Sequence, residues 1–288
     1  MAGLKRLSAW EKAFSLARAR ALETLRHETS EEVWRRGVDL GSTILVFEEL
    51  PRAMDYLREG LQSGRFQHGT LVFARRLTQA KGRFSRSWLA PRGGLWLALA
   101  LYDDLLPEVH PWLPVCLGLA VTRALRKFGA AVWLRWVNDV HVQGRKVAGL
   151  LLEESFVQGE RWILVGIGVN VNNALPEHLL ASSLASLLGR RCSLAALFGQ
   201  LCGELIHFYG LLRTYEAAYL AEEAVENPLR RWFLTLSDTL GQKVLFGEDL
   251  EAGPAEVAWA EGIDSRAGLV LRTAEGSLTL RSGEVRYL

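Results

Sequence analysis

Apolar residues in the first part of the chain follow the spacing of helices. Residues 8–27 place them at three- and four-residue steps, which is the period of one face of an α-helix. Thr29 or Ser30, followed by Glu31 and Glu32, is typical of the start of a second, shorter helix, because a hydroxyl and a nearby carboxylate satisfy free N–H groups. We therefore expect the chain to open with helices that pack on the domain after them.

The pattern then changes to short apolar runs rich in Val, Leu and Ile, which favour buried strands. Six runs of this kind are STILVFEEL, GTLVFARRL, GGLWLALAL, AAVWLRWV, VAGLLLEES and WILVGIGVNV. Helical periodicity appears in RAMDYLREGLQSG, in residues 111–128 and in about residues 176–226, where Asn227-Pro228 ends it. Because few helices separate consecutive strands, a mixed or antiparallel sheet is favoured over a doubly wound one.

Residues 241–288 have a third pattern, in which short predicted strands follow one another closely with Gly, Asp and Ser between them. The expected strands are QKVLFG, AEVAWAEGID, GLVLRT, GSLTLRS and EVRYL. This spacing is typical of a small all-β barrel. The predicted fold class is therefore α+β, a mixed β-sheet with helices followed by a small C-terminal barrel.

Composition narrows the class of protein. The chain has 288 residues, 23% of them charged, and a net charge of +2, which is too small to indicate a general nucleic-acid or membrane binder. Cys116, Cys192 and Cys202 have no metal or redox spacing and indicate a reducing cytoplasm. The opening MAGLKRLSAWEKAF lacks the apolar core of a signal peptide, and no window approaches 18 uncharged apolar residues. We therefore expect neither secretion nor a membrane span.

Three segments carry candidate chemistry, and the first is TQAKGRFSRSWLAPRGGLW, residues 78–96. Its cations are Lys81, Arg83, Arg86 and Arg92, and they are interspersed with glycines. Glycine lets the backbone approach a ligand, and a guanidinium can bind a phosphate through two N–H groups, so this loop could wrap a phosphate. A solvated basic loop is the alternative. We expect residues 80–94 to be mobile without a ligand, since they offer little apolar anchorage.

The second segment, LRWVNDVHVQGRKVAGLLLEES, has the pattern of a strand, a turn with Asn138 and Asp139, and a strand that ends in two carboxylates. Asn and Asp favour turns for local hydrogen-bonding reasons, so the turn alone explains their presence. In a site, Asp139 would lie near a metal or a sugar hydroxyl, and Arg135 would stabilise a developing negative charge. The residues by themselves support both interpretations.

The third segment, VGIGVNVNN, has glycines at positions 166 and 168. It lacks the third glycine and the following helix of a dinucleotide fingerprint, so a Rossmann site is excluded. A strand whose glycines admit a flat ligand, with Asn170 at its end, accounts for the pattern better.

These segments, in this order and ahead of EGIDSRAGLVL and SGEV, resemble the biotin protein ligase family over about residues 44–288. The family patterns are GRGRxGRxW, KWPNDxxxxxxKxxGxLxE and GxGxNVN. The resemblance implies a biotin/lipoate ligase-like domain at 42–232, with a mixed sheet and helices on one face. It also implies an SH3-like barrel at 233–288. Residues 1–41 would be a helical extension, without the N-terminal DNA-binding domain of the members that are also repressors.

The implied activity has two steps. Biotin and ATP form biotinyl-5′-adenylate with release of pyrophosphate, and a lysine of a carboxylase carrier domain then attacks the adenylate. Mg²⁺ would neutralise the phosphates. The implied setting is cytoplasmic, with the biotin carboxyl carrier domain as partner and with neither nucleic acid nor membrane. A homodimer is expected by analogy with family members that pair through the sheet.

The resemblance also implies site residues on the nucleotide side, without a metal site built by the protein. Arg135 stands where the family has a lysine that contacts both the biotin carboxylate and the α-phosphate, and Arg83 where it has the arginine that holds the adenylate. These two are the expected catalytic residues. The adenylate-binding set further comprises Lys81, Gly82, Arg86, Trp88, Asn138, Asp139, Lys146, Gly149 and Asn170, with Glu153 or Glu154 as the terminal carboxylate of the motif.

On the acid side the chain departs from the family. Arg52, Ala53 and Met54 stand at a Ser-Thr-Asn that contacts the biotin ring system, and Leu77 stands at a glutamine with the same role. Each buried polar group of biotin left unpaired would cost about 1–3 kcal/mol. Three interpretations follow: an active biotin protein ligase with a divergent pocket, a ligase of the same fold that adenylates a different carboxylic acid, or a silent relative that binds a nucleotide or a carrier domain.

Overall fold

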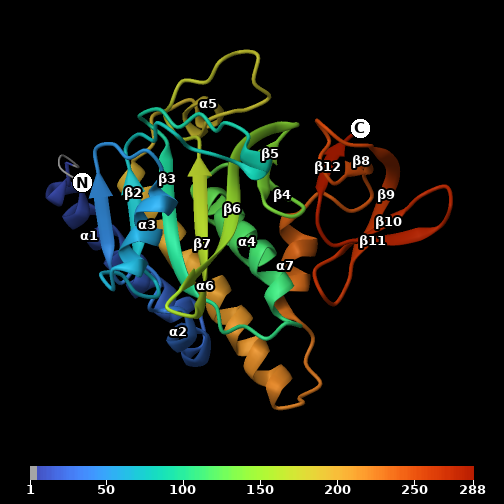
Figure 1. Ribbon diagram of the computed structural model, residues 1–288, viewed down its shortest axis with the longest axis horizontal. Helices are drawn as coiled ribbons and strands as arrows, with labels where there is room; N and C mark the ends of the chain where they lie inside the picture. The colour runs from blue at the N-terminus through green and yellow to red at the C-terminus, as the bar shows by residue number, and fades with distance from the viewer. Residues whose placement is uncertain (1–4) are drawn as a thin grey trace.

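The computed structural model describes residues 5–288 and contains two β-sheets (Figure 1). The larger sheet has seven strands in the order β1-β2-β3-β7-β6-β5-β4. Their bounds are β1 (Ile44–Phe47), β2 (Leu71–Ala74), β3 (Leu95–Tyr102), β4 (Trp133–Arg135), β5 (Asp139–Val142), β6 (Arg145–Val157) and β7 (Glu160–Val169). β1 and β2 run parallel and the other neighbours run antiparallel, so the prediction of a mixed sheet is confirmed.

The helices are α1 (Ser8–Glu28), α2 (Glu31–Gly37), α3 (Ala53–Gln62), α4 (Leu113–Lys127), α5 (Leu184–Leu188), α6 (Leu194–Leu220) and α7 (Pro228–Leu236). Two short 3-10 turns, η1 (Arg83–Ser85) and η2 (His110–Trp112), lie in the connections after β2 and β3. Ser30 begins α2, since its hydroxyl accepts a 3.3 Å hydrogen bond from the Val33 amide. The sequence had left Thr29 and Ser30 as alternatives.

Helices cover both faces of the main sheet, which corrects the expectation that they lie on one face (Figure 1). Strand β3 shows the two sides. Leu97 and Leu99 belong to the core that contains α4 and α6, whereas Ala98 and Ala100 belong to the core that contains α3. The small alanine side chains leave room for α3 to lie close to the sheet. The same face carries the cavity described below.

By length and composition alone, helix α6 contains a window of 18 residues that is apolar enough to cross a membrane. However, 72% of this window is buried inside the fold. The helices α1, α2 and α4 pack on it, and a Cβ added to Gly210 would lie 2.1 Å from the carbonyl oxygen of Val33 in α2. The apolar character of α6 is therefore accounted for by its place in the core.

The segment around Asn138 contains two chain reversals where the sequence indicated one. Arg135 pairs with Asp139, so Asn138 lies in a tight reversal between β4 and β5. Strand β5 then returns through Gln143 and Gly144, whose φ angles are 48° and 75°. A strand of four residues between two turn-forming pairs gives too weak a pattern to be recognised from sequence.

The C-terminal strands form a separate antiparallel sheet in the order β11-β10-β9-β8-β12 (Figure 1). Their bounds are β8 (Lys243–Gly247), β9 (Glu256–Ile263), β10 (Leu269–Arg272), β11 (Ser277–Leu280) and β12 (Glu284–Tyr287). Within residues 5–288 no pairing joins β11 to β12, so the predicted β-sheet is confirmed but its closure into a barrel is not seen.

Two buried tryptophans of the main domain hold the C-terminal sheet in place. Trp136 donates a 2.9 Å hydrogen bond from Nε1 to the carbonyl of Ala267, and Trp112 donates one of 2.8 Å to the carbonyl of Ser265. One continuous apolar core includes residues of both sheets. This docking brings residues 283–285 beside the basic loop.

Candidate active site

Residues from both sheets line a cavity of about 430 Å³, a volume in the range of small-molecule sites. Of the site residues expected from the sequence, those that line it are Arg52, Ala53, Met54, Leu77, Lys81, Gly82, Arg83, Arg86, Trp88, Arg135, Asn138, Asp139, Lys146 and Gly149. Asn170, Glu153 and Glu154, which were also expected, are not among the lining residues. The structure thus brings together residues that the chain supplies from α3, the basic loop, β4, β5 and β6.

Glycines on β6 and β7 form a flat floor, in which Gly149 and Gly168 are cross-strand partners. A Cβ added to Gly168 would lie 3.0 Å from the indole nitrogen of Trp88, and one on Gly166 would lie 2.8 Å from the sulfur of Met54. These glycines therefore admit protein side chains, where the sequence suggested that they admit a flat ligand. Trp88 and Met54 in turn become part of the cavity wall.

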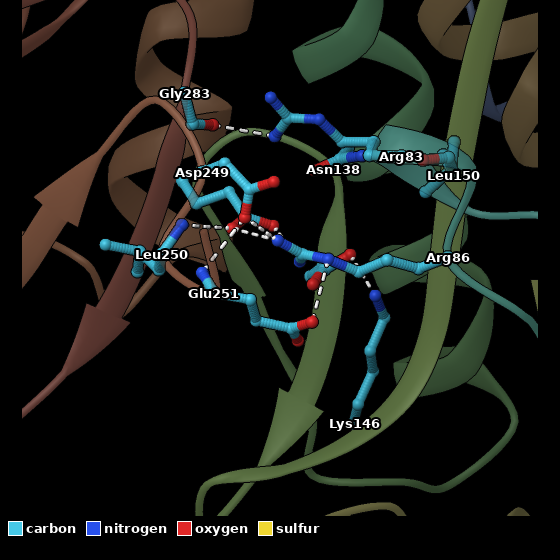
Figure 2. A network of polar contacts seen from close by, with 11 residues as sticks. Arg83, Arg86, Asn138, Lys146, Leu150, Asp249, Leu250, Glu251 and Gly283 are labelled. Carbon is cyan, nitrogen blue, oxygen red and sulfur yellow. Dashed lines mark hydrogen bonds and ion pairs between the residues drawn. The ribbon is translucent and has the colours of Figure 1, made fainter. Parts of the chain in front are cut away.

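A short polar network occupies the end of the cavity near β5 (Figure 2). Lys146 forms a 2.6 Å ion pair with Asp139, and a Cβ on Gly149 would lie 2.7 Å from the Lys146 side chain. Asn138 donates a 2.6 Å hydrogen bond to the carbonyl of Leu150 and accepts one of 3.0 Å from its amide. Asn138 therefore holds the end of β5 against β6, and Gly149 leaves the space in which the cation of Lys146 lies.

The basic loop is tied to the C-terminal sheet by two arginines (Figure 2). Arg83 donates a 2.7 Å hydrogen bond to the carbonyl of Gly283. Arg86 forms ion pairs with Asp249, Glu251 and Glu284, and the pair with Glu251 has a separation of 3.1 Å. Burial opposes the charge of Glu284, but the hydrogen bond from Arg86 holds the pKa of this carboxyl below its usual value.

The contribution of this sheet to the cavity was not predicted from the sequence. Glu251, Gly283, Glu284 and Val285 belong to the lining. The run SGEV, which carries three of them, was a signal that could have found them, because it was already part of the family resemblance. The residues that lie near this run in space could not be predicted from the sequence.

Arg135 lies at the end of β4 with its guanidinium over the ring of Tyr287, 4.0 Å from the ring centroid. Its Nε is buried and has no hydrogen-bond partner within the described residues. A guanidinium held by an aromatic face keeps its charge uncompensated by a carboxylate. Among residues 5–288 no carboxylate forms an ion pair with Arg135, so its positive charge is available at the wall of the cavity.

The acid side has an apolar wall and one ion-pair network. Arg52 forms a bidentate pair with Glu153 and also contacts Asp55, while Arg58 pairs with the same two carboxylates. Burial acts against both charges, but this contact raises the pKa of Arg52 and lowers the pKa of Glu153. Glu153, one of the two carboxylates expected at the end of the motif, thus holds the side chain of Arg52 at the side of the cavity where the carboxylic acid is expected to bind.

Asn170 lies outside the cavity. Its side chain is 3% exposed, and its Oδ1 accepts a 3.0 Å hydrogen bond from Asn173. Its carbonyl accepts one of 3.0 Å from the amide of Leu184. Asn170 therefore fastens the end of β7 to the following segment, and the structure gives it no place against a ligand.

Histidine, cysteine and acidic side chains do not gather into a metal site in residues 5–288, where no group of three or more could hold an ion. The carboxylates that line the cavity include Asp139 and Glu284, and each is already paired with a cation. The three cysteines are buried and form no disulfide with one another.

The chain thus has a mixed sheet with a glycine-floored cavity, bordered by the basic loop and by a small C-terminal sheet. Residues 46–172 match the sequence model of the Biotin/lipoate A/B protein ligase family, so this part of the chain is a domain of that family.

Individual relatives extend the similarity over most of the chain. The "Bifunctional ligase/repressor BirA" of Bacillus subtilis (strain 168) is 26% identical over 257 residues, which are 84% of this chain and 73% of that protein. The "Biotin--[acetyl-CoA-carboxylase] ligase" of Mycobacterium tuberculosis is 28% identical over 237 residues, covering 78% of this chain and 82% of that protein.

Solved structures show the same fold. The biotin protein ligase from Aquifex aeolicus in complex with biotin and ATP has a TM-score of 0.69 at 24% identity, covering 85% of this chain and 98% of that one. The biotin protein ligase from Leishmania major in complex with biotinyl-5-AMP has a TM-score of 0.57 at 22% identity, with 85% and 98% covered.

Proposed function

We propose that this protein is a biotin protein ligase, which forms biotinyl-5′-adenylate from biotin and ATP and transfers biotin to a lysine of a carboxylase carrier domain. The observation that carries the proposal is the convergence of Lys81, Arg83, Arg135 and Lys146 on one cavity with a glycine floor. Cations placed before the reaction stabilise a phosphoryl group without rearrangement. The Mycobacterium tuberculosis relative and the two solved structures, whose names include biotin, support the identity of the acid.

In the first step the carboxylate of biotin attacks the α-phosphorus of ATP, and pyrophosphate leaves. Arg135 supplies positive charge where negative charge develops on the α-phosphate. Arg83 supplies a planar donor that retains the adenylate. In the second step the lysine amine of the carrier attacks the acyl carbon, and AMP leaves.

The proposal includes Mg²⁺ bound to the phosphates. The cavity offers no empty cage of carboxylates, because Asp139 and Glu284 are paired with Lys146 and Arg86. Mg²⁺ commonly binds through substrate phosphates and water with few protein ligands, so the residues fit an ion that enters with ATP. Its contribution would be to neutralise phosphate charge.

Further parts of the proposal concern organisation. The chain divides into a helical extension at 1–41, a ligase domain at 42–232 and an SH3-like barrel at 233–288. The separate C-terminal sheet supports this division, and the antiparallel order of its strands is compatible with a barrel. We place the protein in the cytoplasm, acting on a biotin carboxyl carrier domain, as a homodimer that pairs through the sheet and binds no nucleic acid.

The test is pyrophosphate release from ATP, Mg²⁺ and biotin, followed by labelling of a carrier domain. Arg135→Ala should lower pyrophosphate release by about 100- to 1,000-fold, as expected for loss of a donor to the transition state. Arg76→Ala is the matched control, because Arg76 is exposed and pairs with Glu49 outside the cavity. Undiminished release in Arg135→Ala would remove this residue from the reaction.

A ligase of the same fold that adenylates another carboxylic acid is the second candidate. It is favoured by the acid side of the cavity, where Ala53, Met54 and Leu77 offer apolar surface and the cation of Arg52 is engaged by Glu153. A panel of acids, including biotin, lipoate and octanoate, separates the two candidates. Pyrophosphate release with one of the other acids and not with biotin would select this second function.

A further inference from the structure

The C-terminal sheet places an aromatic ring directly against the cation of Arg135. Tyr287 lies on β12, and its ring centroid is 4.0 Å from the central guanidinium carbon. The electron-rich face of an aromatic ring attracts a guanidinium, more strongly at sites shielded from water. Both side chains are half-buried, and Arg135 lines the cavity, so the contact is partly shielded from water.

Tyr287 is itself held by polar contacts at the junction of the two sheets. Its hydroxyl donates a 2.8 Å hydrogen bond to Oδ1 of Asp238, and this oxygen also lies 3.0 Å from Nε2 of His141. The ring of His141 meets the Tyr287 ring edge-on, with centroids 5.2 Å apart. Although burial opposes it, the contact with His141 holds the pKa of Asp238 below its usual value, so the acceptor of the tyrosine hydroxyl stays ionised at neutral pH.

The same network reaches the backbone next to Arg135. The hydroxyl of Thr239 lies 2.8 Å from that of Tyr287 and accepts a 3.2 Å hydrogen bond from the amide of Trp136. Thr239 is fully buried. The hydroxyl group of Thr239 thus links the Tyr287 side chain to the backbone at the end of strand β4.

We propose that Tyr287 is a positioning residue, which acts from the C-terminal sheet to hold the guanidinium of Arg135 in the orientation that the adenylation step requires. This inference rests on the proposed function. An arginine side chain that is free to rotate loses rotamer entropy when it is fixed. Stacking on the Tyr287 ring fixes the Arg135 side chain before the substrate binds, so the charge is in place when the transition state forms.

The proposal also gives a reason for arginine at position 135. The planar guanidinium stacks on an aromatic ring, whereas the compact, strongly hydrated ammonium of a lysine has no matching plane. Arg135 and Tyr287 therefore act as a pair, and substitution of one should remove most of the effect of substituting the other.

The experiment measures kcat and KM for pyrophosphate release in Tyr287→Leu, Tyr287→Phe, Arg135→Lys and Tyr287→Leu/Arg135→Lys. We expect Tyr287→Leu to lower kcat by about 10- to 30-fold, with little change in KM for ATP, and Tyr287→Phe, which keeps the ring, to restore most of it. In the Arg135→Lys background, Tyr287→Leu should lower kcat by less than about threefold, because the stacked pair is already absent.

Trp112→Phe is the matched control for docking of the C-terminal sheet. It removes the hydrogen bond to Ser265 but touches neither Arg135 nor the cavity lining, so kcat should stay within about twofold of the wild type. A loss as large as that of Tyr287→Leu would overturn the inference, since general loosening of the sheet would then explain both.

A second measurement does not depend on activity. The ¹⁵Nε relaxation of Arg135 should report an ordered side chain in the wild type and a disordered one in Tyr287→Leu. Equal order in the two proteins overturns the positioning role, whether or not the protein is a ligase. Absence of pyrophosphate release by the wild type with every acid overturns the proposed function and leaves this relaxation test valid.

Discussion

At the scale of single residues, Leu77 shows how the cavity departs from its family. Leu77 is half-buried in the cavity lining, where its amide bonds to the carbonyl of Ala90 and its side chain has no polar atom. The backbone therefore holds this position firmly, while the side chain decides what the acid side can recognise. An amide there would offer both a donor and an acceptor to a ureido ring.

We therefore expect Leu77→Gln to tighten biotin binding by about 10-fold, because it pairs a group that is otherwise buried without a partner. Isothermal titration with biotin measures the change, and Leu77→Met is the control, since it keeps the size but adds no amide. Equal affinities of Leu77→Gln and Leu77→Met for biotin would show that a missing amide does not limit recognition.

At the scale of elements, the basic loop connects the main sheet to the C-terminal sheet through the contacts of its arginines. It was expected to be mobile for lack of apolar anchorage, and Phe84 and Leu89 are indeed 44% and 48% exposed. The structure adds an electrostatic anchor at Arg86. Arg86 has three carboxylate partners on the C-terminal side, and a network of this kind is worth more than a single exposed ion pair.

Arg86→Ala should therefore free the loop and raise its rate of cleavage by chymotrypsin roughly 5- to 10-fold, because the population of the open form rises. Chymotrypsin cuts after Phe84, Trp88 or Leu89, so the substitution removes no cleavage site. Arg92→Ala is the control, since Arg92 pairs with Glu48 of the main domain. Equal cleavage of wild type and Arg86→Ala would mean that the loop is held by other contacts.

At the scale of the whole molecule, the junction of the N-terminal helices with α6 contains a buried histidine. His207 is 9% exposed, and its Nδ1 lies 3.1 Å from the hydroxyl of Thr29. Burial, together with the charges of Arg123 and Lys127, lowers the pKa of His207 to about 4, and Glu28 acts in the opposite direction. The folded protein thus keeps this ring neutral where an unfolded chain would protonate it.

Because the folded pKa lies below the unfolded value of about 6.5, the unfolded state binds more protons between these two values. The stability that neutral His207 permits is fully present above about pH 6.5 and falls as the pH drops towards 4. Between pH 7 and 4.5 the wild type should lose roughly 2 kcal/mol more unfolding free energy than His207→Gln, as measured by urea denaturation. The same loss in both proteins would show that His207 does not titrate in this range.

The sequence by itself determined where helices and strands form. Helical spacing in residues 8–27, apolar strand runs and the close strands after residue 241 each follow from local periodicity, and the structure has α1, the main sheet and the C-terminal sheet at these places. The motifs also indicated many of the residues that line the cavity, because the basic loop and the β4 to β6 segment each keep several of them together in sequence.

Tertiary structure alone decided which of these side chains meet. Arg86 and Glu284 are 198 residues apart, and nothing in either segment indicates the other. The place of α3 on the second face, the burial of Asn170 away from the cavity and the stacking of Tyr287 on Arg135 likewise depend on how the sheets and helices dock. Local patterns report the environment of a residue along its own element, whereas contacts of this kind are set by the packing of elements that the chain brings together from far apart.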